Sequence, residues 1–334
     1  MLRFLFGFKW QKSQAHLLLL SKFVRPHTVE DYENLSIMPW KQVLGEAPSK
    51  AINRFIGEGM LKDADNAKSL EWKYKIPDLK KMLKGRNLSV SGNKGDLILR
   101  LIKADPNGMK EDVSGLNVLI CSEKGRKIAD DYLASEKEKQ QNLNQQVLNA
   151  LQKRKFKEAS LLVLSFNAEQ VFPTMLGADL RNPKTLSAFN AVDIVVLKII
   201  FTGNPKILKN LNKEWLEHLR FAAGVMHLLG RDVAKDFIPP NLETGLVLDG
   251  ITAATMIELH AQNQEHLANY LELGVVKSVE ILSAGYNSCE ACEKMAGKKF
   301  KLDEAPELPY ERCTCEMGCR CCYLPVIEGY EDVV

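Results

Sequence analysis

Seven of the eight cysteines of the chain lie close together near its C-terminus. Cys289 and Cys292 form a C-x2-C knuckle, and five more cysteines follow about twenty to thirty residues later. That separation allows two knuckles to close around one tetrahedral Zn²⁺ ion, for which thiolates are preferred ligands. The later cysteines are Cys313, Cys315, Cys319, Cys321 and Cys322. The cluster therefore predicts a metal site with Zn²⁺ as the cofactor.

The spacing leaves the second pair of ligands open, because five cysteines compete for two positions. Gly318 permits a tight turn before Cys319, which makes Cys319 with Cys321 one candidate knuckle, and Cys313 with Cys319 is a rival. A second metal ion, or a redox role for spare thiols, is the alternative to a single zinc site. We expect the metal ligands among Cys289, Cys292, Cys313, Cys319 and Cys321, and we expect Cys315 and Cys322 to matter least.

Residues 73–103 form a second segment whose composition indicates a function, because its many basic side chains could bind an anion. This basic segment contains nine basic residues and two acidic ones, a local charge of +7, so that the rest of the chain, whose total is +3, carries −4. A local excess of cations is what binding to a phosphate backbone needs, since affinity grows with the number of counterions released. The basic residues are Lys73, Lys75, Lys80, Lys81, Lys84, Arg86, Lys94, Arg100 and Lys103.

Apolar spacing in the basic segment predicts two short helices joined by an extended loop. Asn87 can end the first helix because asparagine tolerates positive φ. The turn at Ser91, Gly92 and Asn93 begins the second helix, whose first amides are available to a phosphate. The apolar faces are Leu79, Met82 and Leu83 in the first helix and Leu97, Ile98, Leu101 and Ile102 in the second.

In this register the segment resembles the SAP module, a helix-extended-helix DNA-binding motif. The matching positions are Asp78, Leu79, Lys80, Leu83, Leu88, Ser91, Gly92, Lys94, Leu97, Arg100 and Leu101, while Asn87 and Ser89 stand where the family favours Gly and Pro. The resemblance implies binding to DNA with low sequence specificity. The residues expected to contact DNA are Lys80, Lys81, Lys84, Arg86, Gly92, Asn93, Lys94 and Arg100. The alternative is a solvated basic hairpin that only supports its neighbours.

The elements that must position these two groups are mostly helices, so we expect a mainly α fold. Residues 1–70 form a small N-terminal helical segment with a helix over 48–60, and residues 73–105 form the SAP-like module. Residues 115–275 form a helical domain, with a polar stretch at 124–157 followed by a bundle of apolar-faced helices at 159–172, 186–200, 211–229 and 251–273. Residues 276–334 form a small zinc-stabilised module that begins with a strand over 275–282.

The tail resembles the C-terminal segment of bacteriophage head-morphogenesis, or minor capsid, proteins. The shared layout is a strand, C-x2-C, Gly297 to Phe300, Leu302 to Pro306, Leu308-Pro309 and a closing C-x-C. Tyr310, Glu311 and Arg312 stand where that family commonly has His-Pro before its closing pair. The resemblance implies a protein of phage or prophage origin with a zinc-stabilised tail.

The remaining features favour a binding protein over an enzyme. Walker, G-x-S-x-G, H-E-x-x-H and G-x-G-x-x-G motifs are absent, and His218 and His227 read as histidines at the edge of a core. No uninterrupted apolar run reaches the roughly 18 residues that span a bilayer, so we expect no membrane segment. Clustered thiols without a signal peptide indicate a cytoplasmic protein.

The prediction is thus a DNA-binding protein of phage or mobile-element type, with phage or host proteins as further partners. Two alternatives stay open. The first is a nuclease-like DNA-processing enzyme with an unrecognised active site in the helical region, and the second is a phage head assembly protein.

Overall fold

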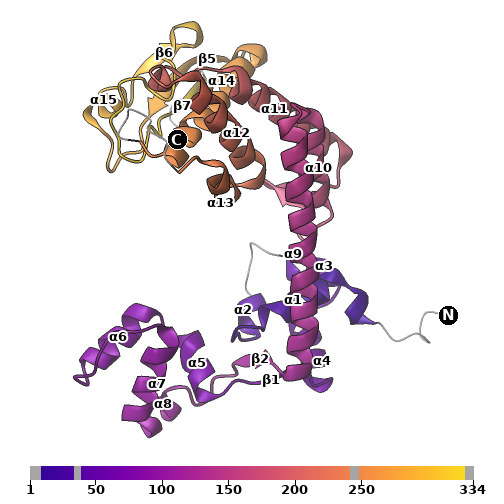
Figure 1. The fold of residues 1–334 in the computed structure, drawn as a ribbon. Coiled ribbons are helices and arrows are strands. Elements are labelled where there is room, and N and C mark those ends of the chain that lie inside the picture. Colours follow the sequence, from indigo (N-terminus) through magenta and orange to yellow (C-terminus); the bar gives the residue numbers. More distant parts are fainter. Residues whose placement is uncertain (1–8, 34–38, 241–247, 328–334) are drawn as a thin grey trace, which may run out of the picture. The chain divides into compact units, whose positions relative to one another are not determined.

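The computed structural model describes residues 9–33, 39–240 and 248–327 of the 334-residue chain. It is mainly helical with a few small sheets (Figure 1), which confirms the predicted fold class. The chain divides into two compact units, Met1–Gln140 and Gln141–Val334, and the long polar helix α9 (Glu123–Gln152) runs through the boundary. The finer division into four domains stays a prediction.

The first part of the first unit packs short helices around buried aromatic rings. α4 begins with Pro48, whose fixed φ suits the first helical turn, and buries Ala51, Ile52 and Phe55 as the periodicity predicts. Cys121 is buried in the same unit. The elements are η1 (Trp10–Lys12), α1 (Gln14–Lys22), α2 (Glu30–Glu33), α3 (Trp40–Leu44), α4 (Pro48–Gly57) and an antiparallel pair of β1 (Leu61–Asp63) with β2 (Leu119–Cys121).

The basic segment forms two helices of a four-helix group with its own core. α6 (Ile76–Lys84) and α7 (Lys94–Ala104) are the predicted pair, and α5 (Asn66–Lys73) and α8 (Pro106–Asp112) flank them (Figure 1). Asn87 ends the first helix region at φ +55°, as its residue type suggests. The buried side chains of this core are Leu70, Leu79, Leu83, Leu97, Ile98, Leu101, Met109 and Val113, with Met82 and Ile102 partly buried against them.

The second unit is a helical bundle that shares its core with the C-terminal sheet. Asparagine and aspartate begin its long helices by accepting backbone hydrogen bonds, as Asn182, Asn212 and Asp249 do. The helices are α10 (Phe156–Ala168), α11 (Pro183–Thr202), α12 (Lys213–Leu229), α13 (Arg231–Ala234) and α14 (Gly250–Leu273), with short elements β3 (Thr174–Met175), β4 (Ala178–Asp179), η2 (Lys206–Leu208) and η3 (Lys235–Phe237) between them.

One stretch of this unit is long and apolar enough to cross a membrane, judged by length and composition alone. It covers Pro183–Leu208, with a mean hydropathy of 1.7 in its best window. The sequence expectation discounted this stretch because Asp193 and Lys198 interrupt its apolar run. In the folded unit Leu197 and Ile200 of this helix lie in the core, and 28% of the apolar window is buried.

The C-terminal module is a three-stranded antiparallel sheet in the order β6-β5-β7. β5 (Val276–Leu282) falls where the sequence predicts a strand, and β6 (Lys299–Lys301) and β7 (Cys322–Ile327) pair with its two edges. The short helix α15 (Glu290–Glu293) lies between β5 and β6, and η4 (Leu302–Glu304) follows β6 on the way to β7. Leu282 pairs with Cys322, so the loops that contain the other clustered cysteines leave the sheet at this end.

A charged cluster lies at the edge of the bundle core, on four different helices. His227 of α12 contacts Asp193 of α11 at 3.2 Å and Glu258 of α14 at 3.5 Å, and Ser160 of α10 donates a 2.6 Å hydrogen bond to Asp193. In a hydrolytic triad the histidine lies between the serine and the carboxylate, whereas here the carboxylate lies between serine and histidine. The cluster is therefore built to hold helices together.

The protonation of His227 should make the stability of this unit depend on pH. Burial works against the charge, but hydrogen bonds to Asp193 and Glu258 outweigh it and raise the pKa of His227 from 6.5 to about 9. A raised pKa gives stability that is fully present below pH 6.5 and is lost as the pH rises through 9. We expect urea denaturation of the full chain to show a loss of about 3 kcal/mol in the second unit between pH 6.5 and 10.

The matched control for this pH dependence is a histidine on the same helix. His227→Gln should flatten the dependence, while His218→Gln, at an exposed position of α12, should leave it as in the wild type. A wild-type profile that stays level between pH 6.5 and 10 would show that His227 is neutral in the folded chain.

Candidate nucleic-acid interface and metal centre

The exposed face of α6 presents three lysines with free ammonium groups. Lys80, Lys81 and Lys84 are exposed, while Leu79 and Leu83 of the same helix are buried in the core beneath them. Positions three and four apart lie on one face of a helix, so the three ammonium groups project to the same side. None of the three makes a hydrogen bond or ion pair with another described residue. They are available to an external anion.

The start of α7 is closed by its own side chains. Asn93 accepts a hydrogen bond from the amide of Asp96, and Asp96 accepts one from the amide of Asn93, which is a reciprocal capping box. Gly92 lies at φ +109°, and a Cβ there would come within 2.8 Å of the Asp96 carboxylate, so only glycine fits. Of the first amides of α7, those of Lys94 and Gly95 remain for a phosphate.

Three of the basic side chains expected to contact DNA instead bind other groups inside the module. Lys94 is half-buried and donates to the backbone carbonyl of Glu71, which joins α7 to α5. Arg100 donates to the carbonyls of Ser89 at 2.7 Å and Ser91 at 3.0 Å, which braces the extended loop. Arg86 pairs with Asp105 at 3.0 Å and lowers the pKa of that carboxyl. The structure thus separates the predicted contacts into an available group on α6 and a group that holds the module together.

The clustered cysteines converge in two groups. In the first, the Sγ atoms of Cys289, Cys292, Cys313 and Cys315 all lie within 4.8 Å of one another. In the second, Cys292, Cys319 and Cys321 meet the same condition. All seven tail cysteines are free thiols, and neither group contains a histidine or a carboxylate. Such groups could bind a metal ion, and thiolate sets of this kind suit zinc.

Local structure positions the thiols of both groups. Cys289 is the N-cap of α15 and Cys292 lies within this helix, so that one turn presents both side chains. Gly318 adopts φ +76°, and its Cα lies so close to α14 that a Cβ would come within 2.6 Å of Met256 and 2.9 Å of Thr252. The turn before Cys319 therefore requires glycine and is packed directly against the bundle.

Backbone amides surround the sulfur atoms. The amide of Cys289 donates to Cys315 Sγ at 3.2 Å, that of Thr314 to Cys289 Sγ at 3.3 Å and that of Tyr310 to Cys319 Sγ at 3.3 Å. Burial raises the pKa of the Cys289 thiol, but hydrogen bonds from the Thr314 and Cys292 amides outweigh it and lower the pKa to about 6. These donors favour the thiolate, which is the form that binds metal.

The structure places one cysteine differently from what its spacing suggests. Cys315, expected to matter least, is buried in the first group, whereas Cys322 is exposed on β7 and belongs to neither group. The five predicted ligands Cys289, Cys292, Cys313, Cys319 and Cys321 all lie in one or both groups. A C-x-C spacing at Cys313 and Cys315 was the signal available for the missing residue.

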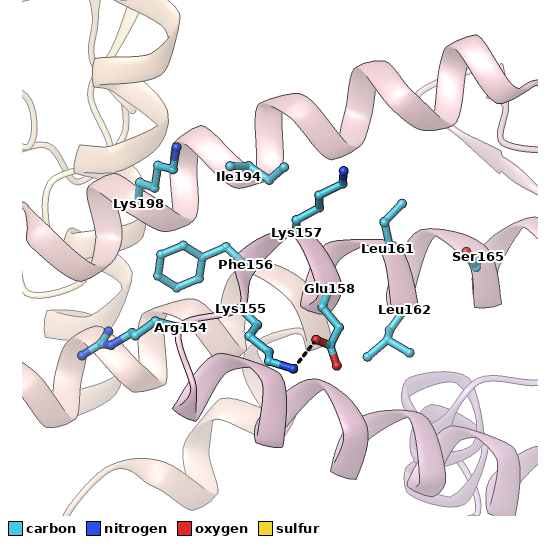
Figure 2. Close-up of a pocket in the computed structure, with 10 residues that line it drawn as sticks. All are labelled: Arg154, Lys155, Phe156, Lys157, Glu158, Leu161, Leu162, Ser165, Ile194 and Lys198. Atoms are coloured by element: carbon cyan, nitrogen blue, oxygen red, sulfur yellow. Dashed lines mark ion pairs between the residues drawn. The ribbon is translucent and has the colours of Figure 1, made fainter.

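A hollow of about 850 Å³ opens between α10 and α11. Figure 2 shows the side chains of Phe156, Lys157 and Ile194 at this space, with Lys198 farther along α11. Its one carboxylate, Glu158, is paired with Lys155 at 2.9 Å. The lining therefore offers cationic and apolar contacts and no pair of groups for acid-base catalysis.

Comparison with known protein families matches residues 73–106 to the SAP domain. This range covers α6, the extended loop and α7, and it confirms that part of the sequence interpretation. No curated protein and no solved structure matches the chain, and no comparison supports the resemblance of its tail to phage proteins. The chain contains a SAP domain, which supports nucleic-acid binding in general.

Proposed function

We propose that the chain binds duplex DNA with little sequence preference, through phosphate contacts of its SAP domain. The observation that supports this most directly is the set of free lysines on the outer face of α6, Lys80, Lys81 and Lys84. Flexible ammonium groups bind phosphates as point charges, and contacts to phosphates carry no sequence information. The basic segment as a whole adds a local charge of +7 to this contact.

We further propose that a structural Zn²⁺ site stabilises the C-terminal module. Four thiolates within 4.8 Å of one another match the ligand number and type of structural zinc sites. A three-stranded sheet of 3 to 7 residues per strand has little core of its own, so a metal adds the stability that such a small module lacks. The metal would then couple to folding, because each thiolate ligand is assembled only in the folded loop.

The biological setting is part of the same proposal. The pattern of the tail, with C-x2-C, Leu308-Pro309 and a closing C-x-C, favours a protein of phage or mobile-element type with phage or host protein partners. A reduced, cytoplasmic environment suits a chain whose eight cysteines are all free thiols. We propose a binding protein rather than an enzyme, since the buried serine, aspartate and histidine of the bundle lie in an order that cannot activate a nucleophile.

Equilibrium binding of the full chain to labelled duplexes tests the DNA part of this proposal. Fluorescence anisotropy with two unrelated 20-base-pair sequences, a single strand and a duplex RNA should give the same affinity for both DNA duplexes and weaker affinity for the others. The affinity should fall steeply with salt, as expected when cations displace condensed counterions. Absence of binding at low salt, or a preference of more than tenfold for one DNA sequence, would contradict it.

A further inference from the structure

We infer that the six clustered cysteines bind two metal ions and that Cys292 bridges them. This inference rests on the metal part of the proposed function and deepens it. Cys292 is the one residue that belongs to both groups of converging thiols, with Cys289, Cys313 and Cys315 on one side and Cys319 and Cys321 on the other. A thiolate has enough lone pairs to bind two ions, and this placement puts Cys292 Sγ between two separate sets of ligands.

The distances between sulfur atoms fit metal coordination in both groups. With a Zn–S bond of about 2.3 Å, the edge of a tetrahedron of sulfur atoms is about 3.8 Å long. Cys289 Sγ and Cys313 Sγ lie 3.9 Å apart in the first group, and Cys292 Sγ and Cys319 Sγ lie 3.9 Å apart in the second. The second group therefore has the dimensions of a site in its own right.

The number of thiolates is also close to what two tetrahedral ions require. The first group supplies the four thiolates of one tetrahedral ion, and the second supplies three for another. With Cys292 shared, the six thiolates fill seven of the eight positions of two tetrahedral ions.

A single ion in the first group would leave the thiols of Cys319 and Cys321 buried and without a metal. Cys319 and Cys321 are 0% and 3% exposed, which removes them from solvent and from most redox partners. Two divalent ions and six thiolates give a net charge of −2, and amide donors from Cys289, Thr314, Cys315 and Tyr310 point at the sulfur atoms to stabilise it. Binding of each ion releases the remaining thiol protons to solvent.

Metal stoichiometry of the full chain, purified with a reductant, tests the inference. Elemental analysis should give two Zn²⁺ per chain, and Co²⁺ titration should reach its thiolate charge-transfer plateau at two equivalents. Cys321→Ser should lower the content to one ion, because it removes a ligand of the second group only. Cys322→Ser is the matched control, since this neighbouring cysteine lies outside both groups, and should keep two ions.

The possible results distinguish this inference from the proposal of a single structural zinc site. One ion per wild-type chain would overturn the two-metal inference and leave the structural zinc site intact. No bound metal in the folded, reduced chain would overturn both. Replacement of zinc by ¹¹³Cd adds a test of bridging: two resonances that are coupled to each other support the shared thiolate, and two uncoupled resonances contradict it.

Discussion

Replacing Lys80, Lys81 and Lys84 together with alanine should weaken duplex DNA binding by roughly 10²-fold at 0.1 M salt. Each free lysine on α6 releases about one counterion when it binds a phosphate, so the slope of log affinity against log salt should fall by about 2 to 3. Folding should be unaffected, because the three exposed side chains make no hydrogen bond or ion pair with another described residue and alanine favours helix. Anisotropy titrations at four salt concentrations measure both quantities.

The matched control removes three positive charges from a surface outside the SAP domain. Lys127, Lys137 and Lys153 are exposed lysines at or next to α9, outside the SAP domain, and their triple alanine variant should keep the wild-type affinity within about threefold. Lys94→Ala tests the basic residues that hold the module together. The Lys94 side chain joins α7 to the Glu71 carbonyl, so this substitution should lower the stability of the module. An unchanged salt slope in the α6 variant would show that DNA binds another surface.

Removal of metal from the full chain should unfold the C-terminal module and leave the SAP domain folded. Structural zinc contributes on the order of 10 kcal/mol in small thiolate sites, which exceeds what a three-stranded sheet of this size can supply. Hydrogen exchange should therefore accelerate in β5 and β7 after chelation. The amides of α6 and α7, whose separate core does not include the tail, should stay protected.

Single substitutions should reproduce the effect of chelation at selected cysteines. Cys292→Ser and Cys315→Ser should both destabilise the tail, since both thiols lie in the four-cysteine group. In the Cys322→Ser control, the amides of β5 and β7 should exchange hydrogen at the wild-type rate. Cys315 is the sharper test, because its sequence spacing did not predict a metal ligand, whereas its position in the four-cysteine group does. Unchanged protection of β5 and β7 in the metal-free chain would show that packing alone holds the module.

The SAP domain could be predicted from the sequence because its determinants are local. Leu79 and Leu83 repeat at helical spacing, Asn87 accepts positive φ, and Gly92 with Asn93 starts the next helix, all within 15 residues. The same holds for the long bundle helices and for the strand β5, whose bounds differ from the predicted ones by a few residues. Such features depend on neighbours in sequence and need no knowledge of distant contacts.

The roles of individual charged residues could not be predicted, because composition does not show which charges are already paired. Lys80 and Lys94 contribute equally to the local charge, yet one is free on α6 and the other is half-buried against Glu71. His227 likewise depends on three other helices, whose Asp193, Glu258 and Ser160 lie more than thirty residues away. Only packing brings such groups to hydrogen-bonding distance.

The sequence by itself determined that the tail has a thiol cluster of metal-binding type and that residues 73–106 form a basic SAP module. Tertiary structure alone decided that the cysteines form two groups, that Cys315 belongs to the first and that Cys292 belongs to both. The physical reason is that about twenty residues separate Cys292 from Cys313, so the sulfur atoms meet only when the chain folds back through β6, and packing of Gly318 against α14 places the turn before Cys319.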